Sequence, residues 1–126
     1  SIIQQDTDMK YTLFVYGTLM QGFSNHYLIE RAEWRGTAKT LEKYSLYESG
    51  IPFVFKGESV SHIYGELYKV DELTLKIVDR LEGHPEWYRR EEVEVITEKE
   101  VNVTAWLYFY PEKRGKLVKS GRYVYR

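Results

Sequence analysis

The chain has 126 residues, 43% of them hydrophobic and 29% charged, which is the balance of a soluble globular domain. Its net charge of −1 gives no general attraction to nucleic acid or to an acidic membrane, and no apolar run is long enough to span a bilayer. The absence of cysteine excludes disulfides, thiolate metal sites and a cysteine nucleophile. Since the three histidines are also dispersed, we expect no bound metal, no nucleic-acid or membrane partner, and a reducing, cytoplasmic setting.

Short apolar segments in the first half of the chain predict a series of strands. Residues 1–8, in contrast, are polar without a period and are expected to form a flexible lead before a single domain of residues 9–126. The predicted strands are separated by turn residues and cover 10–16, 34–47 with a break near Gly36, 51–55 and 62–70. Pro52 places the third strand at an edge or a bend, and Gly65 marks a bulge or a close approach by another group in the fourth.

A glycine-containing turn follows the first predicted strand. Gly17 and Gly22 stand five residues apart around Thr18, and such a turn can direct several backbone N–H groups at an anion. The spacing matches neither a P-loop nor a dinucleotide-binding fingerprint. Beyond the turn, Ser24 can act as the N-cap of a short helix predicted over 25–31.

The second half of the chain carries the clearest helix. Asp71 is a good N-cap and Gly83 a natural stop, so a helix is predicted over 72–82, with an apolar stripe formed by Leu73, Ile77, Val78 and Leu81. Strands are predicted over 88–97 and 101–110, and the second of them alternates along its length. The basic tail after Pro111 is expected to pack on the sheet through Leu117, Tyr123 and Tyr125.

These elements predict an α+β fold. Six or seven strands would form a strongly bent, mostly antiparallel, β-barrel-like sheet, accompanied by two or three short helices. Most spacings between strands are too short for strand–helix–strand crossovers, which argues against a parallel sheet.

The junction between the predicted helix and the strand at 88–97 holds the leading candidate for a catalytic residue. Glu82 ends the helix, and apolar cover from Leu81, Trp87 and Tyr88 would raise its pKa toward a value useful for proton transfer. From the residues alone, an exposed acid at a helix end explains Glu82 more simply. Glu86 is a weaker candidate, and Asp79 is expected to pair with Arg80 or Arg90 in a structural role.

Four motifs in a fixed order resemble those of a known family. They are Val15-Tyr16-Gly17-Thr18-Leu19 continuing through Gly22 to Asn25-His26, Leu41-Glu42-x-Tyr44-x-Leu46 with Ile51-Pro52, Gly65-Glu66-Leu67-Tyr68-x-Val70-Asp71, and Asp79-x-x-Glu82-x-x-Pro85-x-x-Tyr88-x-Arg90. On these residues the chain resembles the gamma-glutamylcyclotransferase-like superfamily, and most closely its gamma-glutamylamine cyclotransferase branch. The resemblance implies a bent-sheet barrel with a cavity between the turn at 16–19 and the glutamate that ends the helix.

The resemblance also implies an activity. Members of the family release 5-oxoproline from a γ-glutamyl amide, through attack of the substrate's own α-amine on its γ-carbonyl. The chain would then be a cyclotransferase that needs neither a metal nor an organic cofactor and acts on a small γ-glutamyl amine or γ-glutamyl peptide. Glu82 would be the catalytic residue that moves the proton. The substrate would be bound by Tyr16, Gly17, Thr18, Leu19 and Tyr88, with Tyr108 as a further candidate.

Two other classes of function stay open at this point. A binding module would keep the pocket for a γ-glutamyl or acidic metabolite without turning it over, whether or not Glu82 is intact. A single-stranded nucleic-acid binder would use the strand aromatics as OB-folds do, but the charge balance and the lack of lysine and arginine between those aromatics argue against it. The motifs do not specify the leaving amine, and a monomer is the simpler expectation.

Overall fold

The computed structural model describes residues 10–124, which hold eight strands, one α-helix and one turn of 3-10 helix. The flexible lead predicted for residues 1–8 therefore lies outside the described residues, as does Tyr125. In chain order the elements are β1 (Lys10–Val15), η1 (His26–Leu28), β2 (Glu33–Thr40), β3 (Ser45–Ser49), β4 (Ile51–Phe55), β5 (Tyr64–Asp71), α2 (Glu72–Glu82), β6 (Arg89–Thr97), β7 (Asn102–Phe109) and β8 (Lys116–Leu117).

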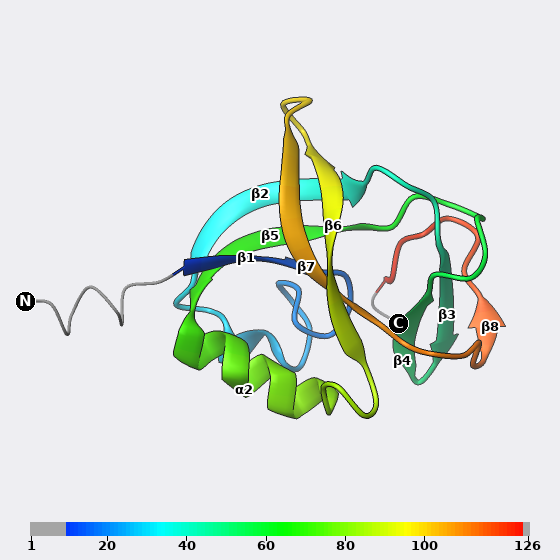
Figure 1. Cartoon of the computed structure of the whole chain (residues 1–126), viewed down its shortest axis with the longest axis horizontal. Helices are drawn as coiled ribbons and strands as arrows, with labels where there is room; N and C mark the ends of the chain where they lie inside the picture. The colour runs from blue at the N-terminus through cyan, green and yellow to red at the C-terminus, as the bar shows by residue number, and fades with distance from the viewer. Residues whose placement is uncertain (1–9, 125–126) are drawn as a thin grey trace, which may run out of the picture.

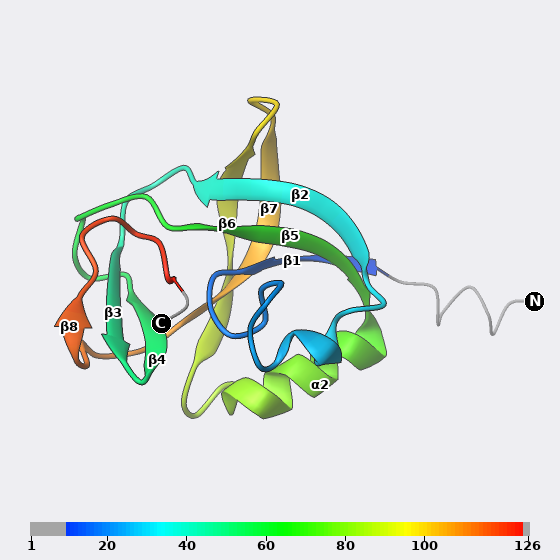
Figure 2. The same cartoon turned by 180° about the vertical axis from the view of Figure 1, so that it is seen from behind.

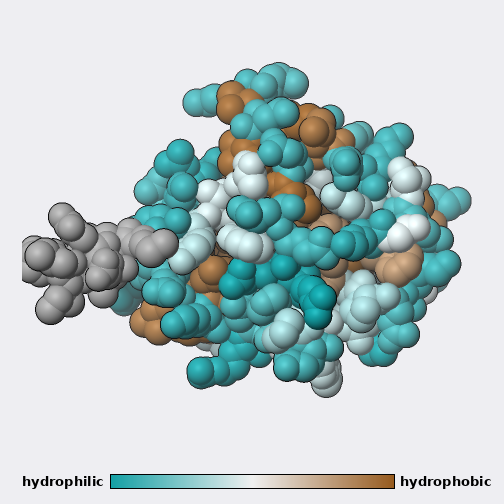
Figure 3. All heavy atoms as spheres, in the orientation of Figure 1, coloured by the Kyte–Doolittle hydropathy of each residue, from teal (hydrophilic) through white to brown (hydrophobic). Residues whose placement is uncertain are grey.

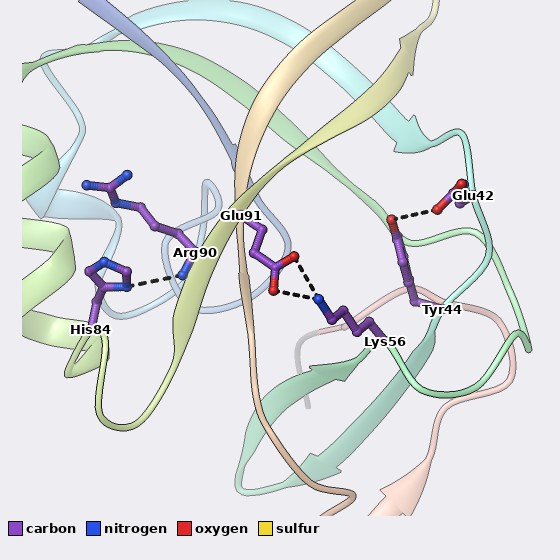
Figure 4. A network of polar contacts seen from close by, with 6 residues as sticks. All are labelled: Glu42, Tyr44, Lys56, His84, Arg90 and Glu91. Carbon is purple, nitrogen blue, oxygen red and sulfur yellow. Dashed lines mark hydrogen bonds and ion pairs between the residues drawn. The ribbon is translucent and has the colours of Figure 1, made fainter.

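Five strands close into a barrel in the order β1-β5-β2-β6-β7. All neighbours in this order are antiparallel, and the barrel closes through a parallel pairing of β1 with β7 at Leu13 and Trp106. A separate sheet with the order β4-β3-β8 lies beside the barrel, and α2 runs along the barrel's lower side in Figures 1 and 2. Lys56, just after β4, forms an ion pair with Glu91 of β6 and so links the two sheets (Figure 4). The predicted α+β, barrel-like fold is confirmed.

Two strand predictions need correction. The break near Gly36 is a bulge within an unbroken β2, because Gly36 has a φ of +96° and the pairing with β5 shifts register between Trp34 and Thr37. The strand ends at Thr40 instead, so the predicted segment 34–47 is divided into β2 and β3. β8 was missed, because two residues paired with β3 leave no periodic pattern in the sequence.

The predicted helix over 25–31 is wrong. The structure forms only the 3-10 turn η1, and the expected two or three helices reduce to one α-helix among the described residues. Asn25 precedes η1 without capping it, since its side chain donates a hydrogen bond to Thr18 Oγ1 (2.9 Å). Asn25, and not the predicted Ser24, therefore precedes the helical turn, and its side chain holds the preceding turn at 16–19.

Helix α2 begins and ends where its sequence predicts. Asp71 Oδ1 accepts a hydrogen bond from the Thr74 N–H (2.8 Å), which caps the first turn. At the other end Gly83 is left-handed with a φ of +67°. The N–H groups of Gly83 and His84 donate to the carbonyls of Arg80 and Asp79, which is the hydrogen-bond pattern of a Schellman motif.

The predicted apolar stripe of α2 is largely wrong. Leu75 and Val78 are the buried residues of this helix, whereas Leu73 is 68% exposed and Ile77 and Leu81 are also exposed. The face of α2 that packs on the barrel is therefore narrower than the face predicted from the four apolar positions. Figure 3 shows hydrophobic side chains on one face over the β6–β7 hairpin and near the start of α2. No helix within residues 10–124 is long and apolar enough to cross a membrane.

The alternation predicted for the strand at 101–110 is confirmed, and both faces of β7 turn out to be covered. Ala105, Leu107 and Phe109 pack in one apolar cluster of the core, and Tyr108 and Tyr110 in the other. Gly65 of β5 allows the close approach that its position predicts: a Cβ there would lie 2.2 Å from the Val15 carbonyl oxygen. The barrel therefore brings the end of β1 tightly against β5, directly before the glycine-containing turn.

Candidate active site

A cavity of about 160 Å³ lies where β1 and α2 end and β4 begins. The turn at 16–19 forms one side, and the start of β4 and the last residues of α2 form others. The segment between α2 and β6 completes the wall. The lining residues are Phe14, Val15, Tyr16, Gly17, Thr18, Leu19, Asn25, Ile51, Pro52, Leu81, Glu82, Trp87, Tyr88 and Tyr108. The turn at 16–19, Glu82, Tyr88 and Tyr108 were predicted from the sequence, and all of them line this one cavity although they are spread over more than ninety positions.

Among residues 10–124, Glu82, the last residue of α2, is the only acidic or basic residue that lines the cavity. Burial raises the pKa of its carboxyl from 4.5 to about 7. The backbone of Glu82 is fixed, because its carbonyl accepts a hydrogen bond from the Tyr88 N–H (3.2 Å). Within residues 10–124 no protein group donates a hydrogen bond to the carboxyl. The side chain is thus free to exchange a proton with a molecule in the cavity.

The cover over Glu82 differs from the one predicted. Tyr88 is buried as expected, but Leu81 is 43% exposed and Trp87 is 68% exposed. These two side chains lie at the exposed mouth of the cavity, and its buried wall includes Tyr16, Tyr88 and Tyr108.

The turn at 16–19 is held in place from both sides. A Cβ on Gly17 would lie 2.4 Å from Pro52 Cγ, so only glycine lets the turn approach β4 this closely. On the other side Asn25 holds the Thr18 hydroxyl, and His26 Nδ1 contacts the Leu19 carbonyl (2.9 Å).

The turn also has unused hydrogen-bond donors. In the described part of the chain, the backbone N–H groups of Gly17, Thr18 and Leu19 donate to no protein acceptor. Three successive free N–H groups beside a cavity are suited to binding an anion or a developing negative charge.

The hydroxyls of the three tyrosines that line the cavity all donate hydrogen bonds to other groups of the protein. Tyr16 donates to the Tyr108 carbonyl (2.7 Å), and Tyr88 donates to the Pro52 carbonyl (2.8 Å). Tyr108 in turn donates its hydroxyl proton to Asp79 Oδ1. Burial raises the pKa of each of these phenols above its ordinary value, so they stay neutral at physiological pH. They shape the cavity, and among its described lining residues Glu82 is the one whose pKa lies near neutral pH.

Asp79 anchors the helix end that carries Glu82. Arg90 binds it in a bidentate ion pair, with Nε 2.8 Å from Oδ1 and a second nitrogen 3.1 Å from Oδ2. Burial alone would raise the pKa of Asp79, but the hydrogen bonds from Arg90 and Tyr108 lower it. His84 accepts a hydrogen bond from the Arg90 N–H (3.2 Å), as Figure 4 shows. The partnership with Arg90 predicted for Asp79 is confirmed.

Other residues were placed differently or overlooked by sequence reasoning. Glu86 is exposed and does not line the cavity. Ile51 and Pro52 do line the cavity, although nothing in their motif indicated this position. The close approach of Pro52 to Gly17 brings them there, and that contact is visible only in the folded structure. Among the described residues, no cluster of three or more histidine and acidic side chains is arranged to hold a metal ion.

Comparisons with known proteins agree with this geometry. Residues 13–125 match the model of a family described as "Gamma-glutamyl cyclotransferase, AIG2-like". A protein of Methanocaldococcus jannaschii named "Putative gamma-glutamylcyclotransferase" is 51% identical over 88% of this chain and 93% of its own length. The "Gamma-glutamylaminecyclotransferase" of Bos taurus is 39% identical over 68% of this chain and 56% of its own length. The crystal structure of an AIG2-like protein from Mus musculus superposes with a TM-score of 0.73 at 30% identity, covering 79% of this chain and 76% of that one.

Proposed function

Because the chain belongs to the gamma-glutamyl cyclotransferase, AIG2-like family, we propose that it releases 5-oxoproline from a γ-glutamyl amine or γ-glutamyl peptide and that Glu82 moves the proton. The observation that carries the proposal is the position of Glu82. Among residues 10–124 it is the one acid–base group near neutral pH in a small cavity that is also lined by the free backbone N–H groups of Gly17, Thr18 and Leu19.

The reaction needs few groups from the protein. The substrate's α-nitrogen forms a bond to its own γ-carbonyl carbon, and the bond from that carbon to the amine nitrogen breaks. Since both reactants belong to one molecule, the protein has only to hold a bent conformer and move a proton. Both of these tasks can be assigned to residues that line the cavity.

Glu82 is suited to the proton transfers. The α-amine is an ammonium at neutral pH and becomes a nucleophile only after it loses a proton. In all, the attacking nitrogen loses two protons as the ammonium becomes a lactam N–H, and the departing nitrogen gains two as it leaves as an ammonium. Ionised Glu82 accepts each proton from the first nitrogen and passes it to the second, so the carboxylate is regenerated. A pKa of about 7 lies near the working pH, where a group can both take and give a proton efficiently.

The turn at 16–19 is suited to the charge on the substrate. Its free N–H groups at Gly17, Thr18 and Leu19 would bind either the substrate's α-carboxylate or the oxyanion that develops on the γ-carbonyl. Tyr16 and Tyr88 would contact the substrate with their rings, since their hydroxyls are already bonded to backbone carbonyls. In this arrangement one wall binds the anionic end of the substrate and the other moves the proton.

A direct assay tests the proposal. The wild-type protein is incubated with γ-glutamyl amines and γ-glutamyl dipeptides, and 5-oxoproline is measured; production by the wild type and its loss in Glu82→Gln are expected. Calorimetric binding of the same compounds by both proteins, without any product from the wild type, would instead identify a binding module. Full activity in Glu82→Gln would refute the role given to this residue.

A further inference from the structure

The segment that follows β7 returns to the loops around the cavity. Beyond β8 it runs back from the β4-β3-β8 sheet toward the barrel, as the red part of Figure 2 shows. There Gly121 meets the start of β5. Its carbonyl accepts a hydrogen bond from the Tyr64 N–H (3.0 Å), and a Cβ on Gly121 would overlap the His62 carbonyl oxygen. Tyr123, two residues further along the chain, therefore extends from a point that is fixed to the barrel.

The side chain of Tyr123 joins two segments that are far apart in the sequence. Its ring lies against the ring of Phe23, with the two centroids 5.3 Å apart. Its hydroxyl donates to the Gly50 carbonyl in the turn between β3 and β4 (3.4 Å). The side chain is partly buried and packs against both apolar clusters of the core. Tyr123 thus connects the loop after β1 with the turn between β3 and β4.

Phe23 is tied by backbone hydrogen bonds to the turn that lines the cavity. Its N–H donates to the Met20 carbonyl (3.1 Å), and the Met20 N–H donates to the Gly17 carbonyl (3.0 Å). Asn25 closes the same loop, because its N–H donates to the Thr18 carbonyl (2.9 Å). A shift of Phe23 is therefore passed over a few residues to the free N–H groups of the turn.

Gly50 directly precedes the part of β4 that lines the cavity. The next two residues both belong to the lining, and the second of them, Pro52, lies so close to Gly17 that a Cβ there would overlap its ring. The Pro52 carbonyl also accepts the hydroxyl of Tyr88 (2.8 Å). A side chain that holds Gly50 and Phe23 together therefore acts on both sides of the contact between Pro52 and the turn.

We propose that Tyr123 is a positioning residue, which fixes Pro52 against the turn at 16–19 and so aligns the free N–H groups of that turn with the substrate. This inference rests on the proposed function, since it concerns the same site. Among the described residues Tyr123 is not part of the lining, so it acts through the two segments that it joins. A misplacement of about 1 Å can lower the rate of a reaction that depends on alignment about a hundredfold.

Substitution of Tyr123 tests the inference on the γ-glutamyl compound that the wild type converts fastest. Tyr123→Ala removes the ring and the hydroxyl and should lower kcat/KM by about 10- to 100-fold. Tyr123→Phe keeps the contact with Phe23 and loses one long hydrogen bond, so its kcat/KM should stay within about threefold of the wild type. In both variants the limb of the pH profile assigned to Glu82 should stay near pH 7, because the carboxyl keeps its surroundings.

A double-mutant cycle assigns the effect to the contact between the two rings. Phe23→Leu and Tyr123→Leu should each lower kcat/KM. The double variant should be about as active as the poorer single variant, because both substitutions remove the same contact. Tyr11→Leu is the matched control and should leave kcat/KM almost unchanged. Tyr11 is also partly buried against one of the two apolar clusters, but it lies near the start of β1 and does not line the cavity.

Amide hydrogen exchange, measured by nuclear magnetic resonance, tests the positioning without a substrate. In Tyr123→Ala the N–H groups of Met20, Phe23 and Asn25 should exchange at least about tenfold faster than in the wild type, because the hydrogen bonds of their loop open more often. The increase should be larger in this loop than in α2. That difference separates a loosened loop from a general loss of stability.

The possible results separate this inference from the proposed function. Absence of 5-oxoproline with the wild type refutes the proposed function, and the exchange rates of the loop then decide by themselves whether Tyr123 holds the turn. An active wild type with unchanged kcat/KM in Tyr123→Ala overturns the inference and leaves the proposed function standing. Exchange that rises equally in the loop and in α2 also overturns it, because Tyr123 would then only support the fold.

Discussion

Glu82→Gln should stabilise the protein while it removes the activity. The carboxyl of Glu82 is partly buried and accepts no hydrogen bond from residues 10–124, so its ionised form is poorly solvated in the folded state. Glutamine has almost the same shape and carries no charge. The substitution therefore removes a half-buried negative charge from the folded state. It also removes the group proposed to accept the proton of the substrate's α-amine.

The magnitude follows from the pKa of Glu82 in the folded protein. That pKa is raised from 4.5 to about 7, and each pH unit between the two values corresponds to about 1.4 kcal/mol in favour of the protonated form. Because water still reaches part of the side chain, we expect about 1–3 kcal/mol of added stability at pH 8. A raised carboxyl pKa weakens the folded state as the pH rises from about 4.5 to about 7. The gain should therefore vanish at pH 4 and reach its full value above pH 7.

Chemical denaturation of both proteins at pH 4 and pH 8 measures this difference, and a 5-oxoproline assay of the same samples measures activity. We expect kcat to fall by about 10²–10⁴, the usual contribution of a general acid–base group. Glu86→Gln is the control, because Glu86 is an exposed acid of the same segment that does not line the cavity. A stability difference that is the same at both pH values would refute the argument from burial.

Three further predictions concern the pH profile, the helix anchor and the turn. kcat/KM of the wild type should rise with pH through a limb near pH 7 as Glu82 ionises, and a rate independent of pH between 5 and 8 would contradict this. Asp79→Asn should lower the free energy of unfolding by about 1–3 kcal/mol at pH 7, measured in urea, since it breaks a partly buried ion pair. Because the pKa of Asp79 is lowered by folding, this loss of stability should shrink as the pH falls below about 3.8. Glu72→Gln is the control: Glu72 belongs to an exposed ion pair, so its substitution should change the free energy of unfolding little. Gly17→Ala should lower the free energy of unfolding by about 1–3 kcal/mol and raise KM. Adding Pro52→Ala to the same chain should recover part of this stability, because it removes Pro52 Cγ, the atom that the new Cβ would contact.

The features of the fold that rest on local chemistry were predictable from the sequence. The caps of α2 follow from Asp71 and Gly83, whose side chain and backbone each satisfy groups within one turn of the helix. The alternation of β7 follows from the period of a strand. The short helix at 25–31 was predicted wrongly because Asn25 has a partner, Thr18, that a helical pattern does not reveal.

The features that depend on distant contacts were not predictable from periodicity. Leu73, Ile77 and Leu81 have helical spacing, yet the line on which α2 meets the barrel is set by β1 and β5 and passes through Leu75 and Val78. For the same reason the motifs indicated the turn at 16–19 and Glu82 as site residues but did not indicate that Ile51 and Pro52 line the cavity. The contact between Gly17 and Pro52 becomes visible only when the turn and β4 are brought together.

The spacing between the two halves of the site is set by the barrel rather than by the loops that carry them. The turn at 16–19 continues β1, and β1 is the neighbour of β7 at the point where the barrel closes. Tyr108 of β7 accepts the hydroxyl of Tyr16 on its carbonyl and donates its own hydroxyl to Asp79, three residues before Glu82. One residue of one strand thus fixes both the turn and the helix end. Because these bonds are made within the fold, the backbone at the end of α2 is held in place, while within residues 10–124 no protein group donates a hydrogen bond to the Glu82 carboxyl.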